Sequence, residues 1–241
     1  VGCWNGEEPR FLAAVQRLTR DVLNQRWQTA KANRLATFIK FAENTWVHAC
    51  RDFHQLMRPT AQLALKTGIC GRDAVIVVRG PHYKRDLEVL LPFVKRARPV
   101  LIGVDGGADA LLEVGFRPDL IVGDMDSVST EALTCGAELV VHAYPDGTAP
   151  GEERIQSLGL VGHLFPIFGT SEDAALMLAY EQGAAQLIVV GSHTSMVDFF
   201  DKGRPGMGST WLVRMWVGDR LIDAKGFHRL HPTFFNGEVP W

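Results

Sequence analysis

The chain has 241 residues, of which 46% are hydrophobic and 22% charged, and its formal net charge is −2. This composition is that of an ordinary globular protein and excludes a disordered, collagen-like or disulfide-stapled chain. The near-neutral total hides a division, because residues 8–66 carry a net charge of +6 and residues 67–241 a net charge of −7. We therefore expect two parts with different roles: a helical arm at 1–66 and an α/β domain at 67–241.

The cysteines and the hydropathy pattern indicate the cellular compartment of the protein. The four cysteines, Cys3, Cys50, Cys70 and Cys135, have neither the spacing of a zinc site nor that of a disulfide framework. No run of about 18 apolar residues is present, and the first residues lack the pattern of a secretory signal. The sequence therefore favours a cytoplasmic location.

Residues 8–57 are predicted to be helical, since after Pro9 they contain neither Gly nor Pro up to residue 57. Apolar residues recur there at alternating steps of three and four, most regularly at Leu35, Ile39, Ala42, Trp46, Ala49, Phe53 and Leu56. This is a heptad-like seam. Polar side chains at Asn24, Gln25 and Gln28 interrupt it, so the pattern leaves open whether the arm is one helix or two.

Two interpretations of this seam remain open. The helix packs on its own domain, or it holds a partner, and we favour a homodimer through the N-terminal helix because the seam extends over several turns. The basic residues of the arm fit a solvated helix face. They are not interleaved with aromatic residues as in a stacking platform, so no nucleic-acid partner is expected.

Short apolar runs alternate with helical stretches after residue 73. Strands are expected at 74–78, 100–104, 120–122, 139–142, 164–168 and 187–190, and helices at 86–96, 108–114, 130–135 and 172–181. Nearly continuous apolar strands between helices predict a doubly wound, mostly parallel α/β sheet covered on both faces. Ligands bind such sheets beyond the carboxyl ends of the strands.

Three aspartates follow two of these predicted strands. Asp105 ends the run at 100–104, and Asp124 and Asp126 follow the run at 120–122. Carboxylates converging on one crevice repel one another unless a cation lies between them, and Mg²⁺ completed by a phosphorylated ligand is the usual partner. The alternative is that each aspartate caps a helix or stabilises a turn. We favour the metal site because three carboxylates share neighbouring strand ends.

Other strand ends supply candidate ligand-binding residues. Glycines there would let a ligand approach the backbone, and hydroxyls and cations would contact phosphates. The candidates are Arg79, Gly80, Lys84, Gly106, Gly107, Ser127, Thr170, Ser171, Ser192, His193 and Thr194. Asp173 would add a fourth carboxylate to the rim. Local helix capping explains Thr170 to Asp173 equally well, and His193 is also explained as an ordinary loop histidine.

The segments Asp105-Gly106-Gly107-Ala108-Asp109 and Pro118 to Ser127 resemble two signatures of the thiamin pyrophosphokinase catalytic domain, D-G-G-A-D/N and P-D-x-x-x-G-D-x-D-S. Within that superfamily the chain is most similar to SteA-like proteins of actinobacterial cell division. The similar segments include Val77 to Gly80, Gly169 to Asp173 and Asp201 to Arg204, and the resemblance covers roughly residues 74–230.

The resemblance implies a site and also marks departures from it. In the pyrophosphokinases, the aspartates that match Asp105, Asp124 and Asp126 surround Mg²⁺ and the ATP phosphates, and Asp173 matches the aspartate of their T-D-x-x-K motif. The lysine of that motif falls at Leu176 here, and residues 191–198 lack the G-G-R-x-D-H segment. Arg79, Lys84, Lys202 and Arg204 are the cations that would take their place. Whether the chain is an active enzyme is therefore left open.

The chain ends before any β-rich thiamin-binding domain, so thiamin phosphorylation is not expected. SteA-like proteins also lack that domain, and they usually carry a further N-terminal domain and a C-terminal membrane-spanning helix. The resemblance thus implies a full-length protein anchored to the inner face of the plasma membrane by a segment absent here, with a membrane-bound division partner.

Three functional hypotheses follow. The first is a SteA-like scaffold whose degenerate pyrophosphokinase fold binds ATP, ADP or another diphosphate ligand with Mg²⁺. The second is an active ATP-dependent diphosphokinase that acts on a non-thiamin substrate, with Asp105, Asp124, Asp126 and Asp173 as its catalytic carboxylates. The third is an interaction module whose aspartates have no ligand.

Overall fold

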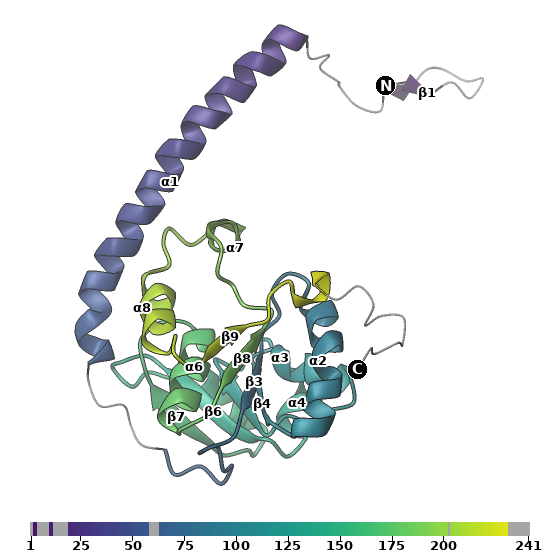
Figure 1. Ribbon diagram of the computed structural model, residues 1–241, viewed down its shortest axis with the longest axis vertical. Coiled ribbons are helices and arrows are strands. Elements are labelled where there is room, and N and C mark those ends of the chain that lie inside the picture. Colours follow the sequence, from purple (N-terminus) through teal and green to yellow (C-terminus); the bar gives the residue numbers. More distant parts are fainter. Residues whose placement is uncertain (1, 4–9, 12–18, 58–62, 202, 231–241) are drawn as a thin grey trace. The chain divides into compact units, whose positions relative to one another are not determined.

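The computed structural model describes residues 2–3, 10–11, 19–57, 63–201 and 203–230 (Figure 1). The chain divides into two compact units, Val1–Glu43 and Asn44–Trp241. The first unit contains a short antiparallel pair, β1 (Gly2–Cys3) and β2 (Arg10–Phe11), and the first part of helix α1 (Arg20–Leu56). The described part of the arm is one continuous helix. Asn24, Gln25 and Gln28 are exposed on it and do not interrupt it, since Asn and Gln are tolerated on a helix surface. Of the helix predicted at 8–57, residues 10–11 are instead strand β2, and residues 8–9 and 12–18 lie outside the described residues.

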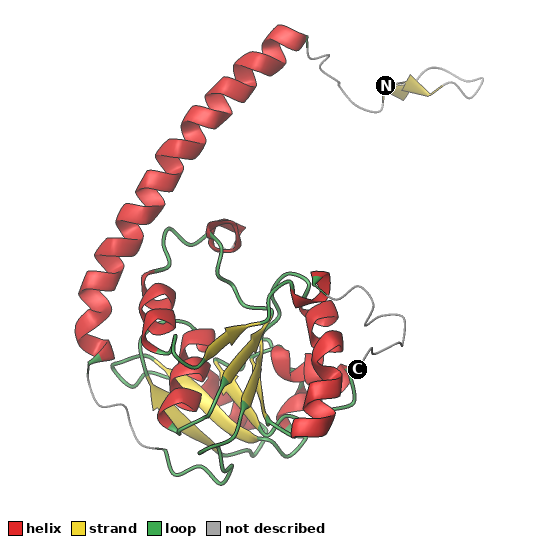
Figure 2. Cartoon of the chain, viewed as in Figure 1, coloured by secondary structure: helices red, strands yellow, loops and turns green. Residues whose placement is uncertain are grey.

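The second unit is built on a seven-stranded parallel sheet (Figure 2). Its strands are β3 (Ala74–Val77), β4 (Val100–Val104), β5 (Leu120–Gly123), β6 (Glu138–Ala143), β7 (Gly162–Pro166), β8 (Leu187–Val190) and β9 (Leu221–Asp223). The spatial order is β7-β6-β5-β4-β3-β8-β9, and every neighbouring pair is parallel. The predicted doubly wound α/β sheet is confirmed, and β9 is a strand that the sequence pattern did not predict.

Helices connect the strands. They are α2 (Tyr83–Ala97), α3 (Gly107–Glu113), α4 (Thr130–Leu133), α5 (Pro150–Ser157), α6 (Ser171–Glu181), α7 (Met196–Asp201) and α8 (Gly208–Trp216), followed by the 3₁₀ turn η1 (Phe227–Arg229). Helices α5, α7 and α8 were not predicted. The first two span eight and six residues, which is too short for an apolar period to stand out.

The two faces of the sheet are covered by different helices. Ile76 and Ile102 point into a core cluster that contains most of the apolar residues of α6 and part of α8. Val77 and Leu101, one position along their strands, point into a second cluster with α2 and α3. Because successive side chains of a strand alternate between the two faces, burial on both sides requires the continuous apolar runs seen in the sequence.

The end of α1 belongs to the second unit. Ala49 and Leu56 are buried and join the same core cluster as α6. The Thr45 hydroxyl accepts a 3.1 Å hydrogen bond from the Met207 N–H, and a Cβ on Gly208 would lie only 2.7 Å from that of His48. The compact units therefore divide between residues 43 and 44, within the helix. This corrects the expected boundary at 66/67, which rested on charge and missed the packing of the last helical turns.

The strand order places a crevice at the carboxyl ends of the central strands. From β3 the chain adds β4 to β7 on one side and later returns to add β8 and β9 on the other. The loops after β3 and β8 therefore diverge, and doubly wound sheets bind ligands beside such a point, at the carboxyl ends of the strands. Separately, among the helices that the structure describes, none combines the length and the apolar character needed to cross a lipid bilayer.

Candidate functional site

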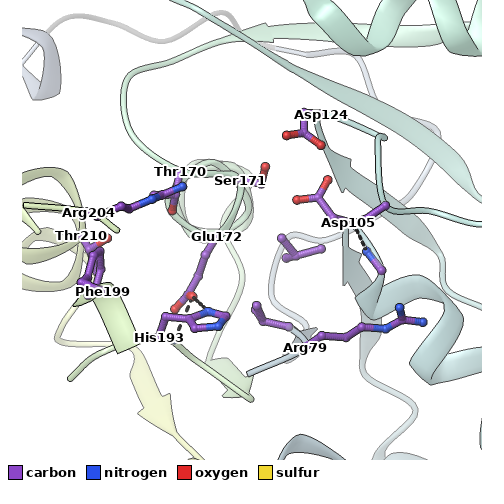
Figure 3. A pocket seen from close by; sticks show the side chains of 14 residues that line it. Arg79, Asp105, Asp124, Thr170, Ser171, Glu172, His193, Phe199, Arg204 and Thr210 are labelled. Carbon is purple, nitrogen blue, oxygen red and sulfur yellow. Dashed lines mark hydrogen bonds and ion pairs between the residues drawn. The ribbon is translucent and has the colours of Figure 1, made fainter. Parts of the chain in front are cut away.

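Two adjoining cavities open at this end of the sheet. The first cavity, of about 350 Å³, is lined by Val78, Arg79, Val104, Asp105, Gly106, Asp124, Ser127, Thr170, Ser171, Glu172, His193, Phe199, Arg204 and Thr210 (Figure 3). The second cavity, of about 320 Å³, is lined by Asp124, Asp126, His142, Ala143, Tyr144, Pro150, Gly169, Thr170, Ser171 and Arg204. Four residues line both cavities: Asp124, Thr170, Ser171 and Arg204. These four mark the divide between them.

Asp105 and Asp124 form a pair of interacting carboxylates in the crevice. Burial and, after it, the charge of Asp124 raise the pKa of Asp105 to about 6. Hydrogen bonds from the Ser171 hydroxyl and from the Met125 N–H, the latter at 3.3 Å, oppose this rise. Figure 3 shows the Ser171 hydroxyl directed toward both carboxylates. Two carboxylates held together in this way gain from a cation between them.

The backbone around this pair is unusual. Asp105 and Met125 have φ angles of +47° and +64°, which non-glycine residues seldom adopt. Such conformations concentrate at functional sites, where the surrounding structure holds them in place. Gly123 has a φ of +151°, and a Cβ on it would lie 1.7 Å from Oδ1 of Asp105.

Arg154 of α5 holds the loop that follows β5. Its Nη1 donates to the carbonyl oxygen of Met125 and, at 2.9 Å, to that of Asp126, and its Nη2 donates to that of Val128 at 2.6 Å. A Cβ on Gly151, at the start of the same helix, would lie 2.2 Å from the carbonyl oxygen of Asp124. Helix α5 is thus fitted against the segment that carries Asp124 and Asp126. Sequence reasoning did not identify Arg154, since nothing near it in the chain indicates a contact 26 to 29 residues away.

Two of the four cations considered as replacements for the motif lysine line the first cavity. Arg79 lies 3.5 Å from Asp109, whereas the Arg204 side chain has no hydrogen-bond or ion-pair partner among the described residues. Figure 3 shows Arg204 reaching toward Thr170 from one side of the crevice, with the Arg79 guanidinium on the opposite side. Lys84 pairs with Glu113 at 2.8 Å and lines neither cavity, and Lys202 is outside the described residues. Leu176, at the motif-lysine position, is completely buried.

Glu172 and His193 form one wall of the first cavity. Glu172 is 6% exposed and accepts a 3.1 Å hydrogen bond from the His193 N–H, and its carboxylate lies 3.6 Å from His193 Nδ1. Arg214 of α8 lies 3.5 Å from the same carboxylate and also pairs with Asp223 of β9. Arg214 thus offsets negative charge in this wall, and the hydrogen bond to Glu172 fixes the backbone of His193 in the site.

Asp173 is not on the rim, which corrects the expectation of a fourth carboxylate there. It is completely buried and lines neither cavity. One of its oxygens accepts from the Thr170 N–H at 2.9 Å and from the hydroxyls of Ser209 and Thr210 at 2.9 and 3.2 Å. With Thr170 it forms a reciprocal capping box at the start of α6. Local helix capping, the alternative considered from the sequence, accounts for the contacts with Thr170, whereas Ser209 and Thr210 come from α8.

The candidate ligand-binding residues divide into those that line a cavity and those that do not. Arg79, Gly106, Ser127, Thr170, Ser171 and His193 line the first cavity, whereas Gly80, Lys84, Gly107, Ser192 and Thr194 line neither. Gly80 and Gly107 are needed for close packing, because Cβ atoms there would lie 2.0 Å from the Gly191 oxygen and 1.9 Å from the Val77 oxygen. The Ser192 hydroxyl donates to Asp223, and the Thr194 N–H donates to Asp198. These four residues thus serve packing and hydrogen bonding around the loops, and Lys84 forms its ion pair with Glu113 on the surface.

The expected ring of three carboxylates is not assembled. Asp126 is exposed, its N–H donates to Asp124 at 3.1 Å, and it lines only the second cavity. Among the described residues, no group of three or more His, Cys, Asp or Glu is placed to hold a metal ion. Asp105 and Asp124 remain as a pair. The second cavity also contains His142 and Tyr144, which inspection of every strand end would have found because they lie at the end of β6.

A cavity of about 520 Å³ lies at the amino ends of β5, β6 and β7. Its carboxylate Glu138 accepts hydrogen bonds from the N–H groups of Lys66 and Thr67, at 2.8 and 2.9 Å, and contacts His163 at 2.9 Å. These hydrogen bonds lower the pKa of Glu138 against the opposing effect of burial. The Glu138 carboxylate thus binds the backbone of the segment before β3 and is not free for a ligand. The crevice at the carboxyl ends of the strands is the better candidate site.

Comparisons with known proteins found similarities over parts of the chain. The sequence model of the thiamin pyrophosphokinase catalytic domain matches residues 93–146. The chain is 34% identical over 147 residues to 6-hydroxymethyl-7,8-dihydropterin pyrophosphokinase of Methanocaldococcus jannaschii, covering 53% of this chain and 61% of the relative. It is 32% identical over 108 residues to the protein of the same name from Pyrococcus furiosus, covering 37% and 44%. The chain thus spans less than two thirds of either relative.

Solved structures that resemble the chain include two thiamin pyrophosphokinases. The enzyme from Bacillus subtilis has a TM-score of 0.34 at 22% identity, covering 54% of this chain and 52% of the other. The enzyme from Geobacillus thermodenitrificans has a TM-score of 0.37 at 24% identity, covering 62% and 58%. The segment that matches the family model runs from α2 to the end of β6 and contains Asp105, Asp124 and Asp126. Over residues 93–146 the chain is therefore similar to the catalytic domain of thiamin pyrophosphokinase.

Proposed function

We propose that the chain binds a nucleoside triphosphate with Mg²⁺ in the first cavity and transfers its terminal diphosphoryl group to a hydroxyl group of an acceptor. The observation that carries this proposal is the pair of carboxylates, Asp105 and Asp124, at the ends of neighbouring parallel strands. The raised pKa of Asp105 marks a site where negative charge is concentrated before any ligand binds.

The residues present fit a magnesium ion shared with a nucleotide. Mg²⁺ is usually held by one or two carboxylates, with water and substrate phosphates completing its shell. Asp105 and Asp124 would hold it, and water and phosphate oxygens would supply the other ligands, since among the described residues no group of three or more His, Cys, Asp or Glu is placed to hold a metal ion. When bound, the ion neutralises charge on the phosphate oxygens. The protein positions the two substrates, and Val78, Val104 and Phe199 supply apolar walls in the first cavity.

The reaction balances as a single displacement. The acceptor hydroxyl oxygen forms a bond to the β-phosphorus, and the bond from that phosphorus to the oxygen of the α-phosphate breaks. The bonding electron pair leaves with AMP, and the hydroxyl proton passes to solvent water. The acceptor class is a flat hydroxymethyl heterocycle such as 6-hydroxymethyl-7,8-dihydropterin, the molecule in the names of the two curated relatives. Tyr144 and His142 in the second cavity offer ring surfaces for such a molecule.

The test combines binding and turnover. Calorimetric titration of the chain with ATP and ADP, each with and without Mg²⁺, measures the first half of the proposal. Release of AMP from ATP is then followed with 6-hydroxymethyl-7,8-dihydropterin, with thiamin and without an acceptor. We expect magnesium-dependent ATP binding and AMP release that requires the pterin. ATP binding without AMP release leaves a nucleotide-binding protein, and no binding at all contradicts the proposal.

A second candidate function is a dimeric SteA-like scaffold of cell division, regulated by the bound nucleotide and joined to a membrane-bound partner. The supporting observation is the exposure of large apolar side chains in two places: Trp46 is 61% exposed and Met215 of α8 is 65% exposed, and the rings of Trp46 and Trp211 lie 6.0 Å apart. Ile39 on α1 is 48% exposed. A second copy of the chain is the proposed occupant, because the arm and the domain carry opposite net charges of +6 and −7.

Sedimentation tests this scaffold directly. Replacing Ile39 and Trp46 with glutamate is expected to turn dimers into monomers, while the buried Ala49 and Leu56 keep the end of the helix on its own domain. Dimers that persist in the double variant would move the interface elsewhere, and a wild-type chain that is monomeric contradicts the dimeric scaffold.

A further inference from the structure

The crevice raises the question of which cation faces the group that is transferred. The thiamin pyrophosphokinase motif that the chain resembles has a lysine at the position of Leu176. Leu176 is completely buried in the core. A diphosphoryl group carries several negative charges, and transferring it requires positive groups aimed at its oxygens. The cation must therefore come from another part of the chain.

Arg204 is the cation that the geometry selects. It lies in the segment between α7 and α8, is exposed, and lines both the first and the second cavity. Its side chain has no hydrogen-bond or ion-pair partner in the part of the chain that the structure describes. Arg79, by contrast, lines the first cavity alone and lies near Asp109. Arg204 is thus available to a ligand that reaches from one cavity into the other.

The other residues that line both cavities also carry groups suited to a phosphorylated ligand. Asp124 offers a carboxylate for a metal ion, and the hydroxyls of Thr170 and Ser171 sit beside it. The Thr170 hydroxyl already accepts a hydrogen bond from the Asp173 N–H at 3.1 Å, and its own proton can be donated outward. The Ser171 proton is donated to Asp105, so the groups left to bind a diphosphoryl group are the Arg204 guanidinium, the Thr170 hydroxyl and a metal ion on Asp124.

We propose that the crevice is a two-substrate site in which the nucleoside part of ATP occupies the first cavity, the acceptor occupies the second, and Arg204 binds the diphosphoryl group at the divide. This inference rests on the proposed function and adds to it the place of transfer and the residue that binds the transferred group. The nucleoside monophosphate half of the ligand lies away from Arg204. Arg204 therefore distinguishes ATP from AMP.

The experiment measures the affinities of ATP, inorganic diphosphate and AMP, each with Mg²⁺, for the wild-type chain and for Arg204→Gln. Hydrogen bonds to charged groups contribute enough that losing the guanidinium is expected to weaken ATP and diphosphate binding by about 10- to 100-fold. The affinity for AMP is expected to stay within about twofold, because AMP lacks the β- and γ-phosphates. AMP release from ATP in the presence of the pterin is expected to fall at least as far as ATP binding.

Two further variants are the controls. Arg229→Gln removes the same charge at an exposed residue of η1 that lines neither cavity, and it is expected to leave all three affinities unchanged. Arg204→Lys keeps the charge but loses the planar pair of donors, and an intermediate ATP affinity is expected. Thermal unfolding of Arg204→Gln should match that of the wild type, because the side chain has no described partner to lose.

The outcomes separate this inference from the proposed function. Wild-type binding of ATP together with less than a twofold change in Arg204→Gln overturns the role of Arg204 and leaves the nucleotide site standing. Equal losses of ATP and AMP affinity also overturn it, since Arg204 would then contact the nucleoside part. A wild-type chain that binds no nucleotide overturns both.

Discussion

Asp105 and Gly123 are fitted to one another at the carboxyl ends of β4 and β5. A Cβ built on Gly123 would lie 1.7 Å from Oδ1 of Asp105 and 2.4 Å from its Cγ. The backbone of Gly123, with a φ of +151°, is also one that other residues rarely adopt. The position of the Asp105 carboxylate thus depends on the absence of a side chain on the neighbouring strand.

Replacing Gly123 with alanine is expected to displace the Asp105 carboxylate. Magnesium-dependent ATP affinity should fall by at least about tenfold, because one of the two carboxylates leaves its place. The free energy of unfolding should fall by about 2 kcal/mol from the strained backbone and the collision together. Calorimetric titration and urea denaturation measure the two effects.

Gly115→Ala is the matched control for this variant. Gly115 also has a positive φ, +81°, but a Cβ there would meet nothing within 4 Å. Its replacement is expected to cost about 1 kcal/mol of stability and to leave ATP affinity unchanged. Unchanged ATP affinity in Gly123→Ala as well would show that Asp105 has no part in the nucleotide site.

Asp124→Asn is expected to weaken ligand binding and stabilise the ligand-free protein. The loss of a carboxylate should lower magnesium-dependent ATP affinity at least about tenfold. At pH 7 the free energy of unfolding should rise by about 1 kcal/mol, because the charge of Asp124 is one of the causes that raise the pKa of Asp105. The gain should shrink at pH 5, where Asp105 in the wild type already carries a proton.

Urea denaturation at both pH values and titration with ATP test this combination. An Asp124→Asn variant that loses stability at pH 7 would mean that the carboxylate holds the loop together. In that case the interpretation of the pair as a ligand site loses its main support.

The sheet and one side of the site could be predicted because their signals are local. Strands buried on both faces give continuous apolar runs, and the loops after them bring Asp105 and Asp124 to one edge whatever the details of packing. Each predicted strand, including the one at 164–168, overlaps an observed strand. The aspartate pair followed from this topology and from the motif spacing alone.

The remaining features depend on contacts between distant segments. Asp173 and Asp124 are both aspartates beyond a strand, yet one is completely buried in a capping box and the other lines both cavities. Nothing in the local sequence distinguishes them, because the hydroxyls of Ser209 and Thr210 come from α8. The role of Arg154 and the place of Arg204 at the divide likewise depend on how loops pack in three dimensions.

Arg154 is expected to be a positioning residue for the loop that carries Asp124 and Asp126. Arg154→Gln removes donors from three carbonyl oxygens, those of Met125, Asp126 and Val128. We expect a loss of about 2 kcal/mol in the free energy of unfolding and a weaker, still magnesium-dependent, ATP affinity. Arg154→Lys should recover part of both.

Gln156→Ala on the same helix controls for a general effect of α5, since the Gln156 side chain bonds only to Glu152, at 3.0 Å, among the contacts described. It should leave ATP affinity unchanged. If Arg154→Gln lowers stability but binds ATP as the wild type does, Arg154 supports the fold without positioning the site.

Asp173 is expected to make stability depend on pH in a way that an asparagine cannot. Burial, followed by the charge of Glu172 among the effects that raise it, moves the pKa of Asp173 from its ordinary value of 3.8 to about 6, while hydrogen bonds from Thr170 and Ser209 act in the opposite direction. The folded state therefore holds the proton more tightly than the unfolded state does. This contribution to stability is fully present below pH 3.8 and is lost as the pH rises through about 6, by up to about 3 kcal/mol.

The amide introduced by Asp173→Asn does not titrate, so the wild type should lose stability relative to the variant between about pH 4.5 and pH 7. Urea denaturation of both proteins at several pH values measures the difference, and parallel pH profiles would mean that Asp173 stays ionised in the folded protein throughout that range.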